Sequence, residues 1–323
     1  MIQAGKSYWG PRASLDVLSA RAHMNGQIRD FFAQRSVLEV ETPLLASATV
    51  TDVNLKSFRV SCETAGHQEV RYLQTSPEFA MKRLLAAGSG PIYQICKAFR
   101  DGEVGRSHNP EFTLLEWYRP GFDHHQLMDE LDELIQFLLG LDGARKITYR
   151  HAFQTSASLD PATADINCLR SEARALGVRD QGLSLTKDDY LDLLLTHVVQ
   201  PALPPGSVFI YDFPASQAAL ANVRDERHPV AERFELFIDG IEVANGYHEL
   251  TDPLEQQRRF ERDLAEREDR GLPLPGIDER FLAALDQGLP PCSGVAVGLD
   301  RLLLVSRNLD AVAKTLAFPW ACA

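Results

Sequence analysis

The sequence predicts an α+β fold, because long helical segments are mixed with short strands that do not alternate with them as in a doubly wound sheet. Hydrophobic residues make up 45% of the 323 residues, which is ample for a large buried core. The sequence contains no internal repeat, low-complexity tract or flexible linker. We therefore expect a single domain over residues 1–323, with a partly helical insertion around residues 145–206.

The first half of the chain opens with a helical pattern. Apolar residues recur at roughly helical spacing over residues 15–35, and this helix is expected to end before Pro43. Thr75-Ser-Pro-Glu78 has the residue types of a helix start and leads into a helix over residues 79–87. A further amphipathic helix is expected over residues 124–140. Short strands are expected at residues 58–60, 71–74, 92–96 and 112–118.

The second half carries weaker patterns, and residues 145–230 are the least readable part. Asp239-Gly240 lies between two strand-like runs and is typical of a two-residue hairpin turn. Residues 254–270 are heavily charged and predict a helix with a solvated face. The other expected elements are helices at 170–177, 187–199 and 300–307, strands at 207–212 and 294–298, and a hairpin over 233–249.

Composition and charge argue against several classes of protein. The formal net charge of −12 is opposite to the basic surface of a protein that grips nucleic acid broadly. The five cysteines are scattered without a CxxC pair, which argues against a disulfide framework and a structural zinc site. The N-terminus lacks a secretory signal pattern, and no apolar stretch approaches the roughly 20 residues that span a bilayer. We expect a soluble, cytoplasmic protein.

The first candidate site runs from Phe99 to Tyr118. Strand alternation places Glu116 and Tyr118 on an otherwise apolar face. A carboxylate that is buried there needs a partner, which is either a structural arginine or lysine or the ammonium group of a ligand. Arg100 and the glycine-containing loop after it favour a phosphate site, because arginine binds phosphate with two hydrogen bonds and glycine lets the backbone approach.

The second candidate site lies on the expected hairpin. With a tight turn at its tip, Glu242 lies opposite Phe237, so Glu235 and Glu242 are diagonal neighbours on one face. Two adjacent carboxylates repel each other unless a cation such as Mg²⁺ lies between them, and a solvated polar face is the alternative. In a regular strand, alternation would place Glu249 on the face opposite to Glu242. A bulge at Asn245-Gly246 could turn Glu249 to the same face.

Two further segments carry weaker signals. The small residues of Gly294-Val-Ala-Val-Gly298 could let a flat ligand lie against the strand, and simple packing is the alternative. Arg301 falls in the first turn of the next helix, where a cation is unfavourable for the helix dipole and so indicates a bound anion. Glu78 falls in the first turn of an earlier helix that Thr75 or Ser76 could cap, and its carboxylate could bind an amine.

Taken in this order, these segments resemble the catalytic core of the class II aminoacyl-tRNA synthetases, and specifically its lysyl branch. The segment ending in Val40-Glu-Thr-Pro43 is similar to motif 1, residues 99–113 to motif 2, and residues 294–301 to motif 3. The resemblance covers residues 15–120 and 207–310. It implies an antiparallel β-sheet flanked by helices, and a homodimer whose interface is shaped by motif 1.

The resemblance also implies a role for each candidate residue. As catalytic residues, Arg100 would bind the α-phosphate of ATP and Arg301 the γ-phosphate, and catalysis would consist of positioning and electrostatic stabilisation. Glu235 and Glu242 would bind Mg²⁺. The other implied ATP-binding residues are Asp101, Gly102, Glu103, Asn109, Phe112, Val243 and Gly298, and the implied lysine-binding residues are Ser76, Pro77, Glu78, Glu116, Tyr118 and Glu249.

Three departures from the lysyl pattern bear on the substrate and the acceptor. Gly102 stands where the lysyl enzymes usually carry glutamate, and Glu103 follows it. Ala296 stands where they carry glycine, and its methyl group disfavours some substrate shapes, so β-lysine is implied alongside α-lysine. The sequence begins almost at motif 1 and leaves no room for the anticodon-binding domain.

In lacking this domain the chain is similar to a paralogous group of the lysyl branch that modifies a protein. The resemblance implies transfer of the activated lysine to a lysine side chain of elongation factor P, with tRNA disfavoured by the acidic balance. The alternatives are a truncated synthetase that acts on tRNA or makes dinucleotides, and a non-catalytic regulatory subunit. Retention of Arg100, Arg301, Glu235 and Glu242 argues against the regulatory subunit.

Overall fold

The computed structural model describes residues 9–177 and 185–323. Most strands of this part of the chain belong to one central sheet, and the rest form a small three-stranded sheet. The strands of the central sheet are β1 (Leu38–Glu39), β5 (Ile92–Phe99), β6 (Glu111–Pro120), β7 (Arg145–Thr148), β8 (Ser207–Pro214), β9 (Val223–Arg224), β10 (Val230–Ile238), β11 (Ile241–His248) and β12 (Cys292–Gly298). The small sheet consists of β2 (Leu45–Ala46), β3 (Arg59–Thr64) and β4 (His67–Leu73).

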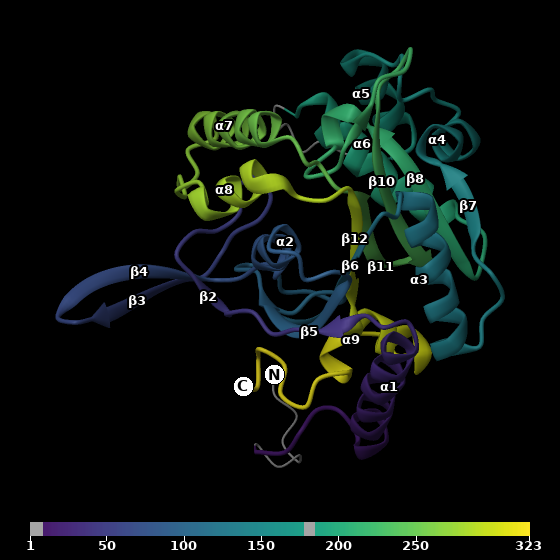
Figure 1. Cartoon of the computed structure of the whole chain (residues 1–323). Coiled ribbons are helices and arrows are strands. Elements are labelled where there is room, and N and C mark those ends of the chain that lie inside the picture. Colours follow the sequence, from purple (N-terminus) through teal and green to yellow (C-terminus); the bar gives the residue numbers. More distant parts are fainter. Residues whose placement is uncertain (1–8, 178–184) are drawn as a thin grey trace.

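The central sheet has the order β1-β5-β6-β12-β11-β10-β8-β7, with β9 paired to β10. Its neighbours are antiparallel except for the pairs β1–β5 and β7–β8, which are parallel. Strands β3 and β4 extend away from the body as a long hairpin (Figure 1). The α+β fold with an antiparallel sheet flanked by helices is confirmed, and each strand predicted in the first half lies within two residues of its expected start or end.

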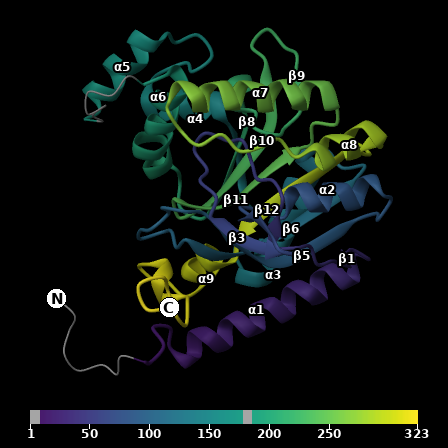
Figure 2. The same cartoon turned by 90° about the vertical axis from the view of Figure 1, so that its left-hand side faces the viewer.

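One face of the sheet is covered by α1 (Leu15–Gln34), α3 (His124–Leu139) and α9 (Leu299–Ser306), which share one apolar core with the strands. Helix α1 runs along the edge of the molecule below the sheet (Figure 2). It begins where Ser14 accepts a hydrogen bond from the Val17 amide, and it buries Phe32 against Tyr93 with ring centroids 4.5 Å apart. These contacts explain why the helices expected at 15–35 and 124–140 form.

The other face carries α2 (Glu78–Ala86), α7 (Pro253–Asp269) and α8 (Glu279–Gly288) beside the strands β5, β6 and β12. Phe79 and Phe281 stack with ring centroids 4.4 Å apart and join α2 to α8. Helix α8 was not expected from the sequence, although Asp278 caps it by accepting hydrogen bonds from the amides of Arg280 and Phe281.

Helix α7 has the solvated face that was expected, and its opposite side is buried. Arg267 is buried and donates hydrogen bonds to the carbonyls of Thr51, Asp52 and Leu55, at 2.7–2.8 Å. A buried guanidinium is stable here because several carbonyl oxygens satisfy its donors. One side of α7 therefore holds the loop 51–55 in place, while the other side is exposed.

The segment predicted as an insertion packs on β8 and β10 with its own apolar core. It contains α4 (Tyr149–Ala157), α5 (Ile166–Ala175) and α6 (Lys187–Leu194), followed by a π-helical turn over 195–199 and a 3₁₀ turn over 200–202. The helix expected at 170–177 begins earlier because Asp165 caps it, and the helix expected at 187–199 is regular only to Leu194. Helix α4 and strand β7 were not expected. Short 3₁₀ turns also occur at Ala215–Gln217 and Val312–Lys314.

Two further properties of the described residues concern their helices and their cysteines. None of their helices is both long and apolar enough to cross a membrane. The five cysteines are free thiols, and Cys96 and Cys292 are buried in the core.

Candidate active site

The hairpin of β10 and β11 forms one wall of the candidate site. Phe237 lies opposite Glu242, as the tight turn predicted. The next pair is Leu236 with Ala244, so Val243 is an extra residue on β11 and forms a β-bulge. Because a bulge reverses the alternation beyond it, the later residues of β11 turn to the face that carries Glu235.

The bulge was predicted at Asn245-Gly246 and lies instead at Val243. Its expected effect, which is to turn Glu249 to the face of Glu235, remains. Asn245 pairs with Glu235 in the register, so residues 245, 247 and 249 share one face. Gly246 is needed for a different reason, since a Cβ there would lie 2.4 Å from the ring of Phe234. Glycine is therefore required at position 246 by close packing and not by a bulge.

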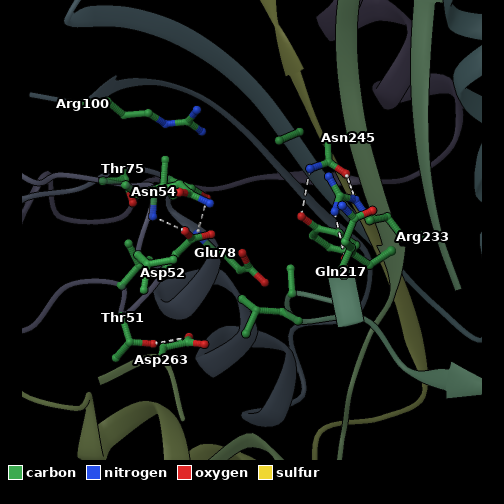
Figure 3. A pocket seen from close by; sticks show the side chains of 18 of the residues that line it. Thr51, Asp52, Asn54, Thr75, Glu78, Arg100, Gln217, Arg233, Asn245 and Asp263 are labelled. Atoms are coloured by element: carbon green, nitrogen blue, oxygen red, sulfur yellow. Dashed lines mark hydrogen bonds between the residues drawn. The ribbon is translucent and has the colours of Figure 1, made fainter. Parts of the chain in front are cut away.

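A cavity of about 1300 Å³ lies between this hairpin, the strands β6 and β12, and the helices α2 and α7. Arg100 and Glu78 reach into it from one side, and Arg233 and Asn245 line the opposite side (Figure 3). Four predicted site residues do not line it: Pro77, Asp101, Gly102 and Glu235. The predicted residues that line it are Ser76, Glu78, Arg100, Glu103, Asn109, Phe112, Glu116, Tyr118, Glu242, Val243, Glu249, Gly298 and Arg301.

Glu116 is a buried carboxylate on the floor of this cavity. Its oxygens accept hydrogen bonds from Ser76 Oγ at 2.7 Å and from the Tyr118 hydroxyl at 2.8 Å. Burial raises the pKa of Glu116 to about 7, and the nearby charge of Glu78 acts in the same direction. An ammonium group that entered the cavity would favour the ionised form and so be bound by it.

Two more carboxylates, Glu78 and Glu249, meet at Lys82. The Lys82 Nζ atom lies 2.6 Å from Glu78 Oε1 and 2.6 Å from Glu249 Oε2. Burial alone lowers the pKa of Lys82, but the two carboxylates raise it above its ordinary value, so the ammonium stays charged. Lys82 is not among the residues predicted from the sequence. It lies four residues after Glu78 on α2, and this helical spacing could have predicted the Lys82–Glu78 ion pair but not the Lys82–Glu249 pair.

The small-residue strand β12 forms the wall next to these carboxylates. A Cβ on Gly294 would lie 2.3 Å from the Tyr118 ring and 2.6 Å from Glu249 Oε1, so only glycine fits. Ala296 lies opposite Glu116 on one side and Asn245 on the other, and its side chain therefore shares their face. The methyl group of Ala296 lines the cavity, as expected from the sequence for a side chain that restricts the shape of the substrate.

Arg100 is the first of the two arginines predicted to bind phosphate, and it lines the cavity. Its guanidinium lies 5.1 Å from the centre of the Phe112 ring and 3.7 Å from Glu103 Oε1. Its buried Nε has no hydrogen-bond partner among the described residues, which fits an absent anionic ligand. Asp101, by contrast, pairs with Lys56 at 2.5 Å and helps to shape the loop.

Glycine at position 102 and the Asn109 side chain also act on the shape of this end of the site. Gly102 has a φ of +86°, a conformation that other residues rarely adopt. Asn109 donates to the Glu111 carbonyl at 2.6 Å and accepts from the Trp320 amide at 2.9 Å. Asn109 therefore fastens the C-terminal segment beside the cavity.

Arg301 is the second of the two arginines predicted to bind phosphate, and it also lines the cavity. Its Nη1 lies 3.3 Å from Glu242 Oε2, and its Nε donates to the Ser107 carbonyl at 3.2 Å. Its Nη2 lies 2.7 Å from His108 Nε2, and burial together with Arg301 lowers the pKa of His108, so a neutral ring accepts this hydrogen bond. These contacts join the loop after β5 to α9 across β11.

Asp300 lies in the first turn of α9 and connects this helix to two distant segments. It accepts a hydrogen bond from the Thr113 amide at 2.9 Å and forms an ion pair with Arg21. Helix α9 has no side-chain cap. The carboxylate therefore ties α1 and β6 to the start of α9, which connects the three segments that resemble motifs 1, 2 and 3.

The carboxylates predicted for Mg²⁺ each have a cationic partner. Glu235 is buried and accepts from Arg233 Nη2 at 2.5 Å, while Glu242 is partly exposed beside Arg301. Burial raises the pKa of Glu235, and Glu242 adds to this rise, as expected for two neighbouring carboxylates. Arg233, which also donates to the Gln217 carbonyl at 2.9 Å, was missed in the sequence.

This donor set fits Mg²⁺ that is held jointly with a nucleotide. Within the described residues, no group of three or more His, Cys, Asp or Glu side chains is arranged to hold a metal alone. Mg²⁺ in phosphate-transfer sites is bound by one or two carboxylates together with phosphate oxygens and water. Glu242 lines the cavity and Glu235 lies outside its lining, so one or both would supply the carboxylates, and Arg100 and Arg301 would supply the cations for the phosphates.

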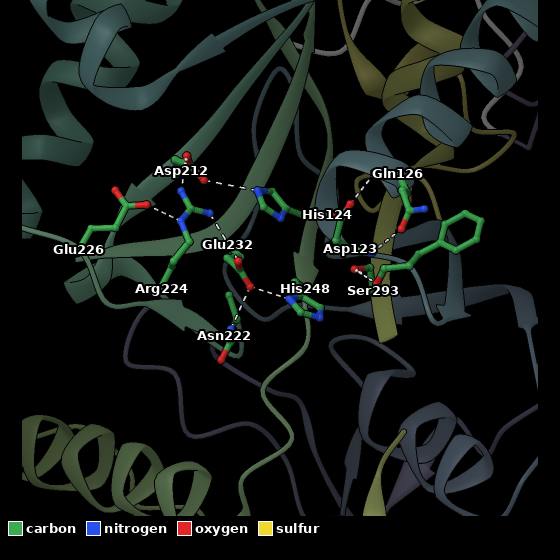
Figure 4. Close-up of polar contacts among 12 residues, drawn as sticks. Asp123, His124, Gln126, Asp212, Asn222, Arg224, Glu226, Glu232, His248 and Ser293 are labelled. Atoms are coloured by element: carbon green, nitrogen blue, oxygen red, sulfur yellow. Dashed lines mark hydrogen bonds and ion pairs between the residues drawn. The ribbon is translucent and has the colours of Figure 1, made fainter. Parts of the chain in front are cut away.

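A second polar cluster lies outside the cavity and has a structural character (Figure 4). Arg224 pairs with Asp212 at 2.8 Å and with Glu232 at 3.4 Å. Glu232 also accepts from His248 Nδ1 at 2.5 Å, and Asp212 lies 3.3 Å from the ring of His124. The cluster connects β8, β9, β10, β11 and the start of α3.

Comparison with known families agrees with this geometry. A model of the family described as tRNA synthetases class II (D, K and N) matches residues 11–321. The chain therefore belongs to the class II tRNA synthetase family.

Within that family, the most informative relatives are ligases that act on a protein. The chain is 50% identical over 319 residues to the elongation factor P–(R)-β-lysine ligase of Hamiltonella defensa subsp. Acyrthosiphon pisum, covering 96% of this chain and 97% of that protein. It is 49% identical over 314 residues to proteins of the same name from Salmonella paratyphi B and Salmonella schwarzengrund, with coverage of 96% and 97%. The resemblance stated from the motifs is confirmed by these relatives.

Proposed function

We propose that this chain activates (R)-β-lysine, or α-lysine, with ATP and transfers it to a lysine side chain of elongation factor P. The observation that carries this proposal is a set of three carboxylates, the buried Glu116 and Glu249 and the partly exposed Glu78, in a cavity that Arg100 and Arg301 also line. Carboxylates suit the ammonium groups of a diamino acid, and arginines suit the phosphates of ATP. The names of the relatives support the same substrate and acceptor.

In the first step, an oxygen of the lysine carboxylate attacks the α-phosphorus of ATP, and the bond to pyrophosphate breaks. Glu116, Tyr118 and Glu249 hold the side-chain ammonium, and Glu78 holds the other amine, so the carboxylate is aimed at the phosphate. Arg100, with its unpartnered Nε, stabilises the charge that develops on the α-phosphate oxygens. Arg301 binds the γ-phosphate and orients the leaving pyrophosphate.

Glu242 and Glu235 complete this arrangement as the carboxylates for the metal. Mg²⁺ would neutralise phosphate charge while bound to them. In the structure, Glu242 pairs with Arg301 in a partly exposed ion pair, and such a pair is weak enough to be exchanged. With a nucleotide bound, Arg301 would face the phosphate, and Glu242 would be available to hold Mg²⁺.

In the second step, an amine of the acceptor attacks the carbonyl carbon of the adenylate. The bond from that carbon to the phosphate oxygen breaks, AMP leaves, the amine loses a proton, and an amide forms. The net charge of −12 favours a protein acceptor over tRNA. We place this reaction in the cytoplasm, where a translation factor acts, and assign a homodimer on the resemblance of the α1–β1 segment to motif 1.

Two measurements test the proposed function. ATP–pyrophosphate exchange with β-lysine and with α-lysine reports the first step, and we expect exchange with at least one of them. Absence of exchange with both would refute activation and favour a regulatory subunit. Intact-mass analysis of elongation factor P, with tRNA as the competing acceptor, reports the second step. An adduct on tRNA with none on elongation factor P would favour the truncated synthetase instead.

A further inference from the structure

Lys82 lies directly behind the carboxylates of the candidate lysine site. Its side chain is 0% exposed and does not line the cavity, whereas Glu78 and Glu249 do. Its Nζ is 2.6 Å from one oxygen of each carboxylate and 5.7 Å from the centre of the Phe281 ring. The other oxygen of Glu249 faces Gly294 on the cavity wall. Lys82 thus holds one oxygen of each carboxylate and leaves the other for a ligand.

The charges around Lys82 can be counted because Lys82, Glu116 and Glu249 are buried and the Glu78 side chain is only 16% exposed. When ionised, Glu78, Glu116 and Glu249 carry three negative charges, and Lys82 carries one positive charge. The cluster therefore presents two net negative charges to the cavity. The two ammonium groups of a diamino acid carry two positive charges, which equal the charge that Lys82 leaves unpaired.

We propose that Lys82 is a positioning residue for the diamino substrate: it fixes the orientation of Glu78 and Glu249 and sets the net charge of the site to match two ammonium groups. The inference rests on the proposed function and names a determinant of its substrate specificity. Lys82 touches the carboxylates and not the substrate, so its effect passes through them. A buried lysine with no partner would be costly, and its two partners are the residues that face the ligand.

The electrostatics of the cluster give this role a pH signature. Burial raises the pKa of Glu249, and the ammonium of Lys82 opposes this rise. Without Lys82, the pKa of Glu249 rises further, so a smaller fraction of this carboxyl group is ionised near pH 7 and able to bind an ammonium group. The ionised fraction returns as the pH approaches the higher pKa. The other titratable groups that face the cluster are Glu116 and Tyr118 from β6, Tyr247 from β11 and Cys292 from β12.

The test compares Lys82→Met with the wild-type protein in ATP–pyrophosphate exchange between about pH 6.5 and pH 9. We expect the KM for lysine to rise roughly tenfold or more near pH 7, since one pKa unit corresponds to a tenfold change in ionised fraction. This difference narrows as the pH rises, while the KM for ATP changes less than about twofold. The matched control is Lys97→Met, which removes a partly exposed lysine paired with Glu111 at 3.4 Å and is expected to follow the wild type.

Two results would overturn the inference while leaving the proposed function intact. One is a KM for lysine in Lys82→Met that equals the wild-type value at every pH, and the other is a rise that is the same at every pH, as a purely structural role predicts. Absence of lysine-dependent exchange in the wild type would refute the proposed function and the inference with it.

A second pair of variants covers the case in which Lys82→Met does not fold. Lys82→Arg keeps the positive charge and Lys82→Gln removes it, while both change the shape of the side chain. We expect the pH-dependent rise in KM for Lys82→Gln and a profile parallel to the wild type for Lys82→Arg. Equal pH dependence in the two variants would show that the charge of Lys82 is not what matters.

Discussion

Arg301 Nη1 lies 3.3 Å from Glu242 Oε2, so the side chain proposed for the γ-phosphate and the side chain proposed for Mg²⁺ neutralise each other. The Arg301 side chain is 21% exposed and that of Glu242 is 40% exposed, and an ion pair with this exposure contributes little to stability. We infer that the ion pair neutralises both side chains in the absence of ligands, until ATP and the metal bind together.

Replacement of Arg301 by alanine tests this view. We expect Arg301→Ala to lower the exchange rate by roughly a hundredfold or more, the usual effect of losing one stabilising donor to a transition state. The thermal unfolding midpoint should change little, because the pair is partly exposed. Arg307→Ala, at the exposed end of the same helix, is the control and should keep full activity. Wild-type exchange in Arg301→Ala would refute the phosphate role.

The methyl group of Ala296 gives a prediction on substrate choice. It lies between Glu116 and Asn245 on the cavity face of β12, where a methyl group limits the space beside the carboxylate that we propose for lysine. We expect Ala296→Gly to raise the use of α-lysine relative to β-lysine. One methyl group changes such a ratio by about tenfold to two-hundredfold at most. The ratio of kcat/KM for the two lysines in the exchange reaction measures it, and an unchanged ratio would contradict the proposed contact.

Local patterns predicted much of the site, and distant contacts explain what they missed. The register of Phe237 with Glu242 follows from the two-residue turn between their strands, so the sequence alone predicted it. The bulge was predicted at Asn245-Gly246 and lies at Val243, because the glycine at 246 is required by its close packing against Phe234 on the neighbouring strand and not by a bulge. Such packing leaves no local signal.

Lys82 shows the same limit at the level of the site. Its contact with Glu78 follows from helical spacing, whereas its contact with Glu249 joins a helix to the end of a strand much later in the chain. The sequence therefore predicted the three carboxylates and left open whether protein or ligand supplies their cation. In the structure the protein supplies one cation, which leaves room for a ligand to supply the rest.

The polar cluster outside the cavity predicts how stability depends on pH. Burial raises the pKa of Asp212, but hydrogen bonds from His124 and Arg224 lower it below its ordinary value. A carboxyl group with a lowered pKa in the folded state stabilises the protein above its ordinary pKa of about 4, and this contribution is lost as the pH falls through the lowered pKa. Acidification should therefore destabilise the wild type more than a variant without this charge.

Asp212→Asn tests this sign. Asp212 has a φ of +59°, which asparagine also tolerates, so the change removes the charge with little backbone strain. We expect a loss of about 1–3 kcal/mol in the free energy of unfolding near pH 7, and a smaller difference from the wild type near pH 3. Denaturant titrations at both pH values measure it. Asp286→Asn, at an exposed position of α8, serves as the control, and a loss that stays constant with pH would contradict the electrostatic explanation.

Gly246 provides the last prediction, since its lack of a side chain is what lets β11 pass over Phe234. A Cβ at this position would lie 2.4–2.9 Å from three carbons of a ring that is itself fully buried. We expect Gly246→Ala to destabilise the protein by about 1–3 kcal/mol, as overpacking of a core usually does. Gly276→Ala is the matched control, because nothing lies within 4 Å of a Cβ there. Since Asn245 and Tyr247 flank this glycine and line the cavity, the KM for lysine should rise together with the loss of stability. A stable Gly246→Ala variant with an unchanged KM would contradict this prediction, because it would show that the Phe234 ring moves aside while β11 keeps its place.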